Sequence, residues 1–198
     1  QLLPLDMLVV SPNNIWIAFW VGHGQLWHYD GNNWKVSEDI GGGINCLAKK
    51  SDTDLWAGGR IGRYDGDNVA VANYKNGTWI WNEMTIKGEI LDMSTDTQGN
   101  VWACGRNGLV MKYSNNIWIA DTINIKLGTN FSYLLAGIKY YNSKIYVVGA
   151  KINKNTLLET HYYISGDIKN WTVQDSMVFN PSVNVKWGNW GLHRSNDD

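Results

Sequence analysis

Residues 29–34 read YDGNNW, a tyrosine and a tryptophan on either side of a short polar turn. Related stretches recur along the chain: YKNGTW at 74–79, YSNNIW at 113–118 and SGDIKNW at 165–171. A second pattern precedes each of them: NNIW at 13–16, TDLW at 53–56, GNVW at 99–102 and SKIY at 143–146. Aromatic residues beside Asp and Asn can mark a carbohydrate site, but four copies at regular intervals indicate a structural repeat.

The spacing of the second pattern indicates the fold. Its aromatic anchors, Trp16, Trp56, Trp102 and Tyr146, stand about 40 to 46 residues apart. Repeats of this length are typical of β-propellers, in which each repeat forms a blade of four antiparallel strands. The segments between turns are short, alternate with a period near 2 and are rich in β-branched and aromatic residues, which favours strands over helices. We therefore predict an all-β propeller of four-stranded antiparallel blades.

The repeats also predict the organisation of the chain. We expect a single β-propeller domain over residues 1–198, with blades at approximately 5–43, 44–89, 90–133 and 134–182. Residues 183–198 resemble the first strand of a further blade, because SNDD takes the place that SPNN has in the first repeat. We therefore expect four blades plus the start of a fifth, as part of a larger ring. A closed ring of four blades is the alternative that the length allows.

Composition excludes several classes of protein. The 198 residues include 12 Trp, 10 Tyr and 21 Gly and carry a formal net charge of −1. The Lys and Arg residues are scattered, so we expect no nucleic-acid partner. No stretch approaches the roughly 18 apolar residues of a membrane span, so we expect none. Cys46 and Cys104 match no metal-binding spacing and are expected to be free, buried thiols.

Two repeated motifs carry a family resemblance. The pattern W-x-G-G or W-x-x-G, followed by YDG-x-x-W, resembles the propeller repeats of bacterial two-component-regulator sensor domains. It is also similar to propellers common in secreted and lipid-anchored proteins of the Bacteroidetes group. SGDIKNW (165–171) resembles a degenerate Asp-box hairpin, with Lys169 near the place where that motif has glycine. The resemblance covers nearly the whole chain and implies an extracytoplasmic location (periplasmic, surface or secreted), without specifying a ligand.

Loop lengths indicate which end of the blades carries a site. The turns after the first and third strands of each repeat are short and alike. The loops after the second strands differ, and they are WVGHG (20–24), RIGRYDGDN (60–68), RNG (106–108) and AKINKNT (150–156). Variable loops on a rigid scaffold are where binding residues concentrate. We call this end of the blades the variable-loop face.

The candidate ligand-binding residues lie in these loops. Trp20, Arg60 and Arg106 each stand four residues after an anchor, and His23, Arg63 and Tyr64 lie nearby. Arginine suits carboxylates and phosphates, and tryptophan can stack on a sugar or a peptide side chain. The alternative is that the arginines bridge neighbouring blades. His23 and His28 have no evident third ligand, so we expect neither a metal nor a cofactor.

The sequence favours a binding protein over an enzyme. It contains no G-x-S-x-G, H-E-x-x-H or phosphate-loop motif, and we assign no catalytic residue. We therefore expect a non-catalytic binding or docking module whose partner is a protein or a carbohydrate. The alternative is part of a carbohydrate-active enzyme, either sialidase-like or with paired carboxylates. A structural spacer without a small ligand is the third interpretation. In each of these interpretations we expect Trp34 to pack between blades as scaffold.

Overall fold

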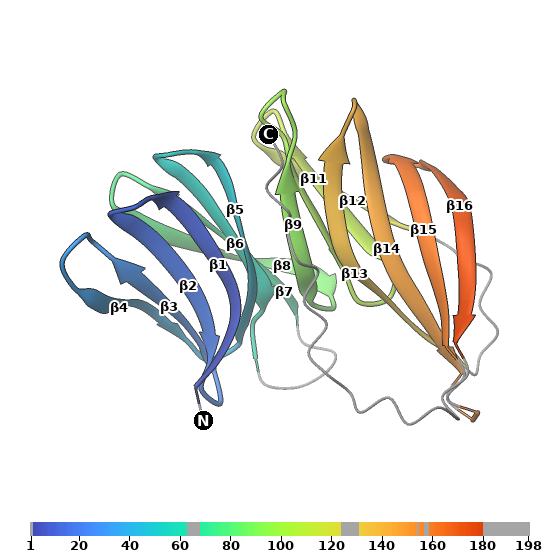
Figure 1. Ribbon diagram of the computed structural model, residues 1–198, viewed down its shortest axis with the longest axis horizontal. Coiled ribbons are helices and arrows are strands. Elements are labelled where there is room, and N and C mark those ends of the chain that lie inside the picture. Colours follow the sequence, from blue (N-terminus) through green and yellow to red (C-terminus); the bar gives the residue numbers. More distant parts are fainter. Residues whose placement is uncertain (1, 63–67, 124–130, 154, 157–158, 180–198) are drawn as a thin grey trace.

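The structure is a computed structural model that describes residues 2–62, 68–123, 131–153, 155–156 and 159–179. Within these ranges the chain forms sixteen β-strands and no helix. The strands make four antiparallel sheets of four strands, and each sheet takes its strands in chain order (Figure 1). The prediction of an all-β propeller with four-stranded antiparallel blades is confirmed. Residues 183–198, where a further strand is predicted, lie outside the described residues.

Each sheet is one blade. The first blade contains β1 (Leu3–Ser11), β2 (Asn14–Trp20), β3 (Gly24–Tyr29) and β4 (Trp34–Ile40). The second contains β5 (Gly43–Ser51), β6 (Asp54–Arg60), β7 (Asn68–Lys75) and β8 (Thr78–Lys87). The third contains β9 (Ile90–Thr95), β10 (Val101–Gly105), β11 (Leu109–Ser114) and β12 (Ile117–Thr122). The fourth contains β13 (Phe131–Tyr141), β14 (Lys144–Asn153), β15 (Glu159–Asp167) and β16 (Asn170–Phe179).

The four blades follow one another in an arc, with the first and fourth at its two ends (Figure 1). The first strands of successive blades pack in series, β1 against β5, β5 against β9 and β9 against β13. No helix long and apolar enough to span a bilayer occurs in the described part of the chain.

In the second and third blades, asparagine and glycine close the hairpin between the third and fourth strands. Asn76 and Gly77 have φ of 54° and 83°, and Asn115 and Asn116 have φ of 51° and 64°. Two successive positive φ angles define the type I′ turn, whose twist matches that of the flanking strands. Asn and Gly adopt this conformation with least strain, so these turns fix the register of the hairpins in the second and third blades.

The hydrophobic core is divided into three layers, one between each pair of neighbouring blades. In each layer the anchor aromatic of one blade packs against the hairpin of the next. The Trp16 ring lies 4.9 Å from Tyr74 and 5.4 Å from Trp79, measured between ring centroids. The equivalent distances from Trp56 are 4.5 Å to Tyr113 and 5.6 Å to Trp118. Trp102 shares the third layer with Trp171.

The expectation that Trp34 packs between blades is wrong. Trp34 is 43% exposed, and its ring lies 5.3 Å from Tyr29 of its own hairpin. The equivalent Trp79 is only 5% exposed, because the first blade covers it. Trp34 stands at the end of the arc, on the side of the first blade that faces away from the second.

Both cysteines are free and buried, as predicted. Cys46 lies in the layer between the second and third blades, and Cys104 in the layer between the third and fourth. Burial raises the pKa of both thiols well above the usual value, because the thiolate is poorly solvated there. They are therefore packing residues of the core.

Candidate functional site

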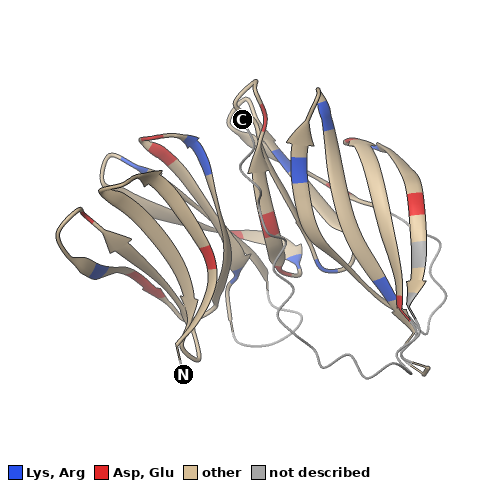
Figure 2. Cartoon of the chain, viewed as in Figure 1, with Lys and Arg blue, Asp and Glu red and all other residues tan. Residues whose placement is uncertain are grey.

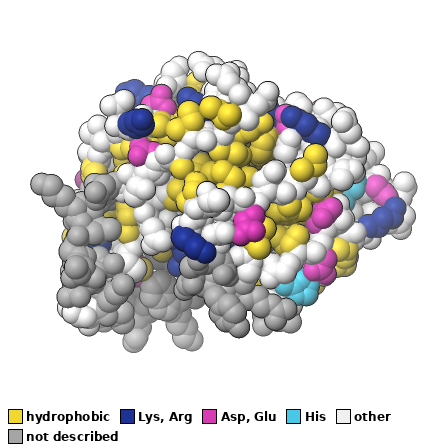
Figure 3. Space-filling model, turned by 180° about the vertical axis from the view of Figure 1, so that it is seen from behind, with side chains coloured by type: hydrophobic (Ala, Val, Ile, Leu, Met, Phe, Trp, Pro, Cys, Tyr) yellow, Lys and Arg dark blue, Asp and Glu magenta, His cyan; other side chains and the backbone are white. Residues whose placement is uncertain are grey.

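The second strands of the blades deliver the predicted residues to the variable-loop face. β2 ends at Trp20, β6 ends at Arg60, and Arg106 follows the last residue of β10. Because the strands are antiparallel, the first strand of each next blade begins at this same end. Charged residues are dispersed over the blades (Figure 2). From behind, hydrophobic side chains gather near the middle of the molecule (Figure 3).

Two of the predicted arginines converge on one carboxylate. Glu89 is buried just before β9, and its Oε2 accepts a hydrogen bond from Arg106 Nε at 2.7 Å. Its Oε1 accepts a hydrogen bond from Asn45 Nδ2 at 2.9 Å and lies 3.7 Å from Arg60 Nε. We call Asn45, Arg60, Glu89 and Arg106 the Glu89 cluster. Asn45 and Arg60 belong to the second blade and the other two residues to the third, so the cluster spans a blade junction.

The backbone places these four side chains. Asn45 is an extra residue in β5, between the paired residues Ile44 and Cys46. Such a bulge redirects a side chain, and Asn45 Nδ2 also donates to the carbonyl of Ile90 at 2.7 Å. Arg106 N donates to the carbonyl of Glu89 at 3.1 Å. A Cβ on Gly105 would lie 1.9 Å from that carbonyl, so glycine is required for this close approach.

The cluster combines a structural contact with an exposed cation. Arg60 is largely buried beside Glu89 and so bridges two neighbouring blades. This is the arrangement expected if the arginines have a structural role and do not bind a ligand. The side chain of Arg106 is 46% exposed although its Nε is held by Glu89. The four side chains carry two positive charges and one negative charge. They therefore leave a net positive charge at the junction, with Arg106 facing solvent.

The other predicted residues lie elsewhere. Trp20 and His23 belong to the first blade, where His23 Nε2 lies 2.9 Å from Asp39 Oδ1. Gln25 Nε2 donates a hydrogen bond to the other oxygen of Asp39 at 2.8 Å. His23, Gln25 and Asp39 therefore form a second polar cluster on the variable-loop face. Arg63 and Tyr64 lie outside the described residues. The structure thus brings Arg60 and Arg106 together on Glu89 and gives His23 partners in its own blade.

Glu89 and Asn45 were not singled out from the sequence. Glu89 is one of only four glutamates, and it ends the variable segment MTIKGE directly before an apolar strand. An acid directly before an apolar strand, with an arginine 17 residues later at the end of the following strand, is the sequence pattern that points to Glu89. Asn45 gave no signal, because the bulge that aims it is visible only in the strand register.

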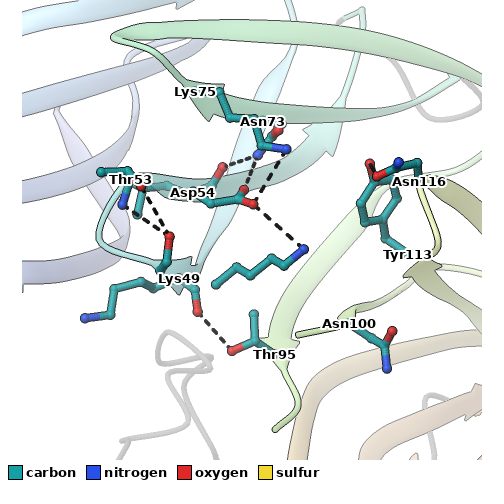
Figure 4. A network of polar contacts seen from close by, with 12 residues as sticks. Lys49, Thr53, Asp54, Asn73, Lys75, Thr95, Asn100, Tyr113 and Asn116 are labelled. Atoms are coloured by element: carbon teal, nitrogen blue, oxygen red, sulfur yellow. Dashed lines mark hydrogen bonds and ion pairs between the residues drawn. The ribbon is translucent and has the colours of Figure 1, made fainter. Parts of the chain in front are cut away.

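A polar network at the other end of the blades is structural (Figure 4). Asp54 accepts a hydrogen bond from Asn73 Nδ2 at 2.6 Å, and Lys50 and Lys75 lie 3.8 and 3.7 Å from it. Thr95 Oγ1 donates to the carbonyl of Lys49 at 2.9 Å. These contacts join strands of the second blade and tie β9 to β5. The acid of this network is satisfied by its own neighbours.

A shallow hollow of about 300 Å³ lies between the third and fourth blades. Its lining includes Asp121, Lys169 and Trp171, which are residue types that contact sugars. Asp121 Oδ2 already accepts hydrogen bonds from Lys169 N at 2.7 Å and from Trp171 Nε1 at 3.2 Å. These groups hold the fourth hairpin to the third blade. Among the residues that the structure describes, no group of three or more His, Cys, Asp or Glu could hold a metal ion.

Comparison with known proteins identifies the fold. No protein-family model and no curated protein matches the chain. The chain is similar to the solved structure of YCF48 bound to D1 peptide, with a TM-score of 0.53 and 12% identity over 86% of this chain and 52% of that one. It is also similar to YCF48 from Cyanidioschyzon merolae, with a TM-score of 0.52 and 15% identity over 86% of this chain and 58% of that one.

A third similar structure is the WD40 β-propeller domain of Doa1, with a TM-score of 0.47 and 9% identity over 89% of this chain and 85% of that one. The chain spans somewhat more than half the length of the two YCF48 structures. At such identities the similarity concerns the fold alone. The four sheets and the two YCF48 structures together show that the chain has the β-propeller fold.

Proposed function

We propose that this chain is a non-catalytic binding module that holds a segment of a protein partner on its variable-loop face, at the Glu89 cluster. The observation that carries the proposal is Arg106, whose side chain is half exposed while Glu89 fixes its Nε at 2.7 Å. The repeat resemblance further supports placing the module in a secreted or surface protein.

A guanidinium held in this way is suited to recognition. Binding normally immobilises a long side chain at a cost of about 0.5–1.5 kcal/mol, and a side chain that is already oriented avoids part of it. Guanidinium groups pair with carboxylates more strongly than neutral donors do. The net positive charge of the cluster therefore favours a partner segment with an acidic side chain.

The fold similarity supports a protein partner over a sugar. One of the similar propellers was solved bound to a peptide. In the present chain the hollow that has sugar-binding residue types uses its Asp121 carboxylate for the contact between blades. The Glu89 cluster presents its charge at the loops, where a peptide segment can reach it.

A phage-displayed library of random peptides tests the proposal, with the purified protein as bait. We expect enrichment of peptides containing Asp or Glu, and binding that weakens as salt rises. Arg106→Gln should weaken the best synthetic peptide about tenfold or more, which is about 1.4 kcal/mol. The matched control is Lys35→Gln, because Lys35 is an exposed cation paired with Asp30 at the opposite end of the blades.

A glycan array and a panel of glycosidase substrates should be run beside the library. Glycoside turnover that is lost when a Glu or Asp is replaced would overturn the proposal in favour of an enzyme. Peptide binding that is equally strong in Arg106→Gln and in the wild type would place the site away from the Glu89 cluster.

A further inference from the structure

The hollow between the third and fourth blades has an apolar lining and shares no residue with the Glu89 cluster. It measures about 300 Å³ and lies beside the outer strands β12 and β16. Ile123 and Ile164 are buried beneath it, and β16 contributes the half-buried Trp171 and Val173, which is 46% exposed. Sites for small molecules occupy about 300–1,000 Å³. The hollow is therefore large enough for the apolar body of a small ligand.

The carboxylate in this hollow is already engaged within the chain. Asp121 Oδ1 accepts a hydrogen bond from Thr122 N at 2.8 Å. Asp121 Oδ2 accepts hydrogen bonds from Lys169 N at 2.7 Å and from Trp171 Nε1 at 3.2 Å. Because a carboxylate offers about four acceptor sites, Asp121 has little capacity left for the several hydroxyl groups of a sugar. The lining thus favours a ligand that is mainly apolar.

Within the described part of the chain, the Lys169 ammonium has no counter-ion. The exposed Lys169 makes its contact through its backbone N–H, and no carboxylate forms an ion pair with its Nζ. The neighbouring cation is different, since Lys112 Nζ lies 4.6 Å from the centroid of the Trp102 ring and 3.8 Å from Asp167 Oδ1. Lys169 lines the hollow, so an acidic group of a ligand can pair with its ammonium.

The backbone conformation of Lys169 also indicates a function for its side chain. Its φ is 69°, in the left-handed region that disfavours residues with a Cβ. The other described non-glycine residues with positive φ are all Asn or Ser. Asn relieves part of this strain through local hydrogen bonds of its short side chain, which lysine does not make. Strained residues concentrate at functional sites, so the strain at Lys169 supports a binding role for the ammonium.

We propose that this hollow binds a small aromatic carboxylic acid. The ring of the ligand lies over Ile123 and Ile164 and against Trp171, where a contact between aromatic rings adds to the burial of apolar surface. Its carboxylate pairs with the Lys169 ammonium at the rim. This site is separate from the protein-binding site proposed at the Glu89 cluster, and neither depends on the other.

Two probes of the same shape test the proposal, cinnamate and its neutral amide, cinnamamide. Each is titrated into the isotope-labelled protein, and binding is followed in amide NMR spectra. We expect both probes to shift the signals of the Lys169 backbone N–H and the Trp171 indole N–H. Cinnamate should bind about fivefold more tightly than cinnamamide, which is the preference that one exposed ion pair provides.

Lys169→Gly should remove this preference, so that both probes bind with the same affinity. Glycine adopts the left-handed conformation without strain, so the variant keeps its fold and a lost preference reports on the ammonium. The matched control is Lys144→Gly, because Lys144 is an exposed lysine of the same blade outside the hollow. Val173→Asp places a negative charge in the hollow and should weaken cinnamate more than cinnamamide.

Three results would overturn the proposal. They are the absence of binding of either probe, equal affinity of the two probes for the wild type, and a preference that survives Lys169→Gly. Arg106→Gln should leave the preference unchanged. If Arg106→Gln removed the preference and Lys169→Gly did not, the carboxylate of cinnamate would bind at the Glu89 cluster and the hollow would have no role.

Discussion

The carboxylate of Asp6 accepts a hydrogen bond from the backbone N–H of Leu47 at 2.7 Å, across the junction between the first and second blades. Asp92 accepts the same kind of hydrogen bond from Ile138 at 2.9 Å, between the third and fourth blades. Both aspartates directly follow the extra residue of a bulge in the first strand of their blade. The bulge therefore aims an acidic side chain at the neighbouring backbone, and this contact locks two of the three junctions.

Replacing Asp6 by alanine should lower the free energy of unfolding by about 2 kcal/mol, because a buried N–H loses a charged acceptor. Asp6→Asn keeps an oxygen that can accept the hydrogen bond and should lose less. Urea titration of the three proteins measures the difference. A loss no larger for Asp6→Ala than for Asp6→Asn would show that the contact with Leu47 contributes nothing.

Trp79→Ala should lower the free energy of unfolding by about 3–5 kcal/mol, because it leaves a cavity in the hydrophobic layer between the first two blades. Trp34→Ala alters the same hairpin position in the first blade and should cost less than about 1 kcal/mol, since that ring is 43% exposed. Urea titration measures both losses. Equal losses would mean that Trp34 is covered within the chain.

The fold was predictable because its determinants are local and repeated. The anchors Trp16, Trp56 and Trp102 recur at similar intervals along the chain. The conformation of turns such as Asn76-Gly77 depends only on the φ angles that the turn residues themselves can adopt. Repetition of such signals through the chain outweighs the ambiguity of any single strand. All three anchor tryptophans are buried in equivalent layers between blades.

What could not be predicted depends on neighbouring blades. Trp34 and Trp79 have closely related local sequences, but within the described part of the chain only Trp79 has a neighbouring blade packed against it. Glu89 could not be predicted for the same reason, because its contacts with Arg60 and Arg106 depend on the relative placement of two blades. The arginines were identified by their position after an anchor, whereas the acid that orients them follows no repeat.

His28 should make stability depend on pH near neutrality. Burial lowers the pKa of His28 more than the nearby Asp30 carboxylate raises it, and Lys35 adds to the lowering. The ring stacks on Trp16 at 4.0 Å between centroids, and its Nε2 lies 3.0 Å from Asn14 Oδ1. Because the folded pKa is below the unfolded value, unfolding takes up a proton. This contribution to stability is present above about pH 6.5 and is lost as pH falls through the folded pKa.

His28→Asn removes this titration and has a precedent in the chain, since Asn73 pairs with Trp56 as His28 pairs with Trp16. We expect the fall in melting temperature between about pH 7.5 and about pH 5 to be smaller in the variant than in the wild type. The absolute melting temperature of the variant is not the readout, because the variant also loses the ring stacking. An unchanged pH slope would show that His28 does not cause the dependence.

Lys169→Gly should stabilise the protein. Lys169 has a φ of 69°, in the left-handed region, whereas the equivalent hairpins of the first two blades have Gly31 and Gly77 with positive φ. Relief of about 1–2 kcal/mol of backbone strain exceeds the about 0.4–1 kcal/mol that glycine costs through the unfolded chain. The contact from Lys169 N to Asp121 Oδ2 uses the backbone and is kept. Calorimetry should show a melting temperature higher by a few degrees.

The control is Lys144→Gly, because Lys144 is an exposed strand residue outside the left-handed region. This variant should lower the melting temperature instead. A lower melting temperature for Lys169→Gly as well would show that the lysine side chain contributes more than its backbone conformation costs.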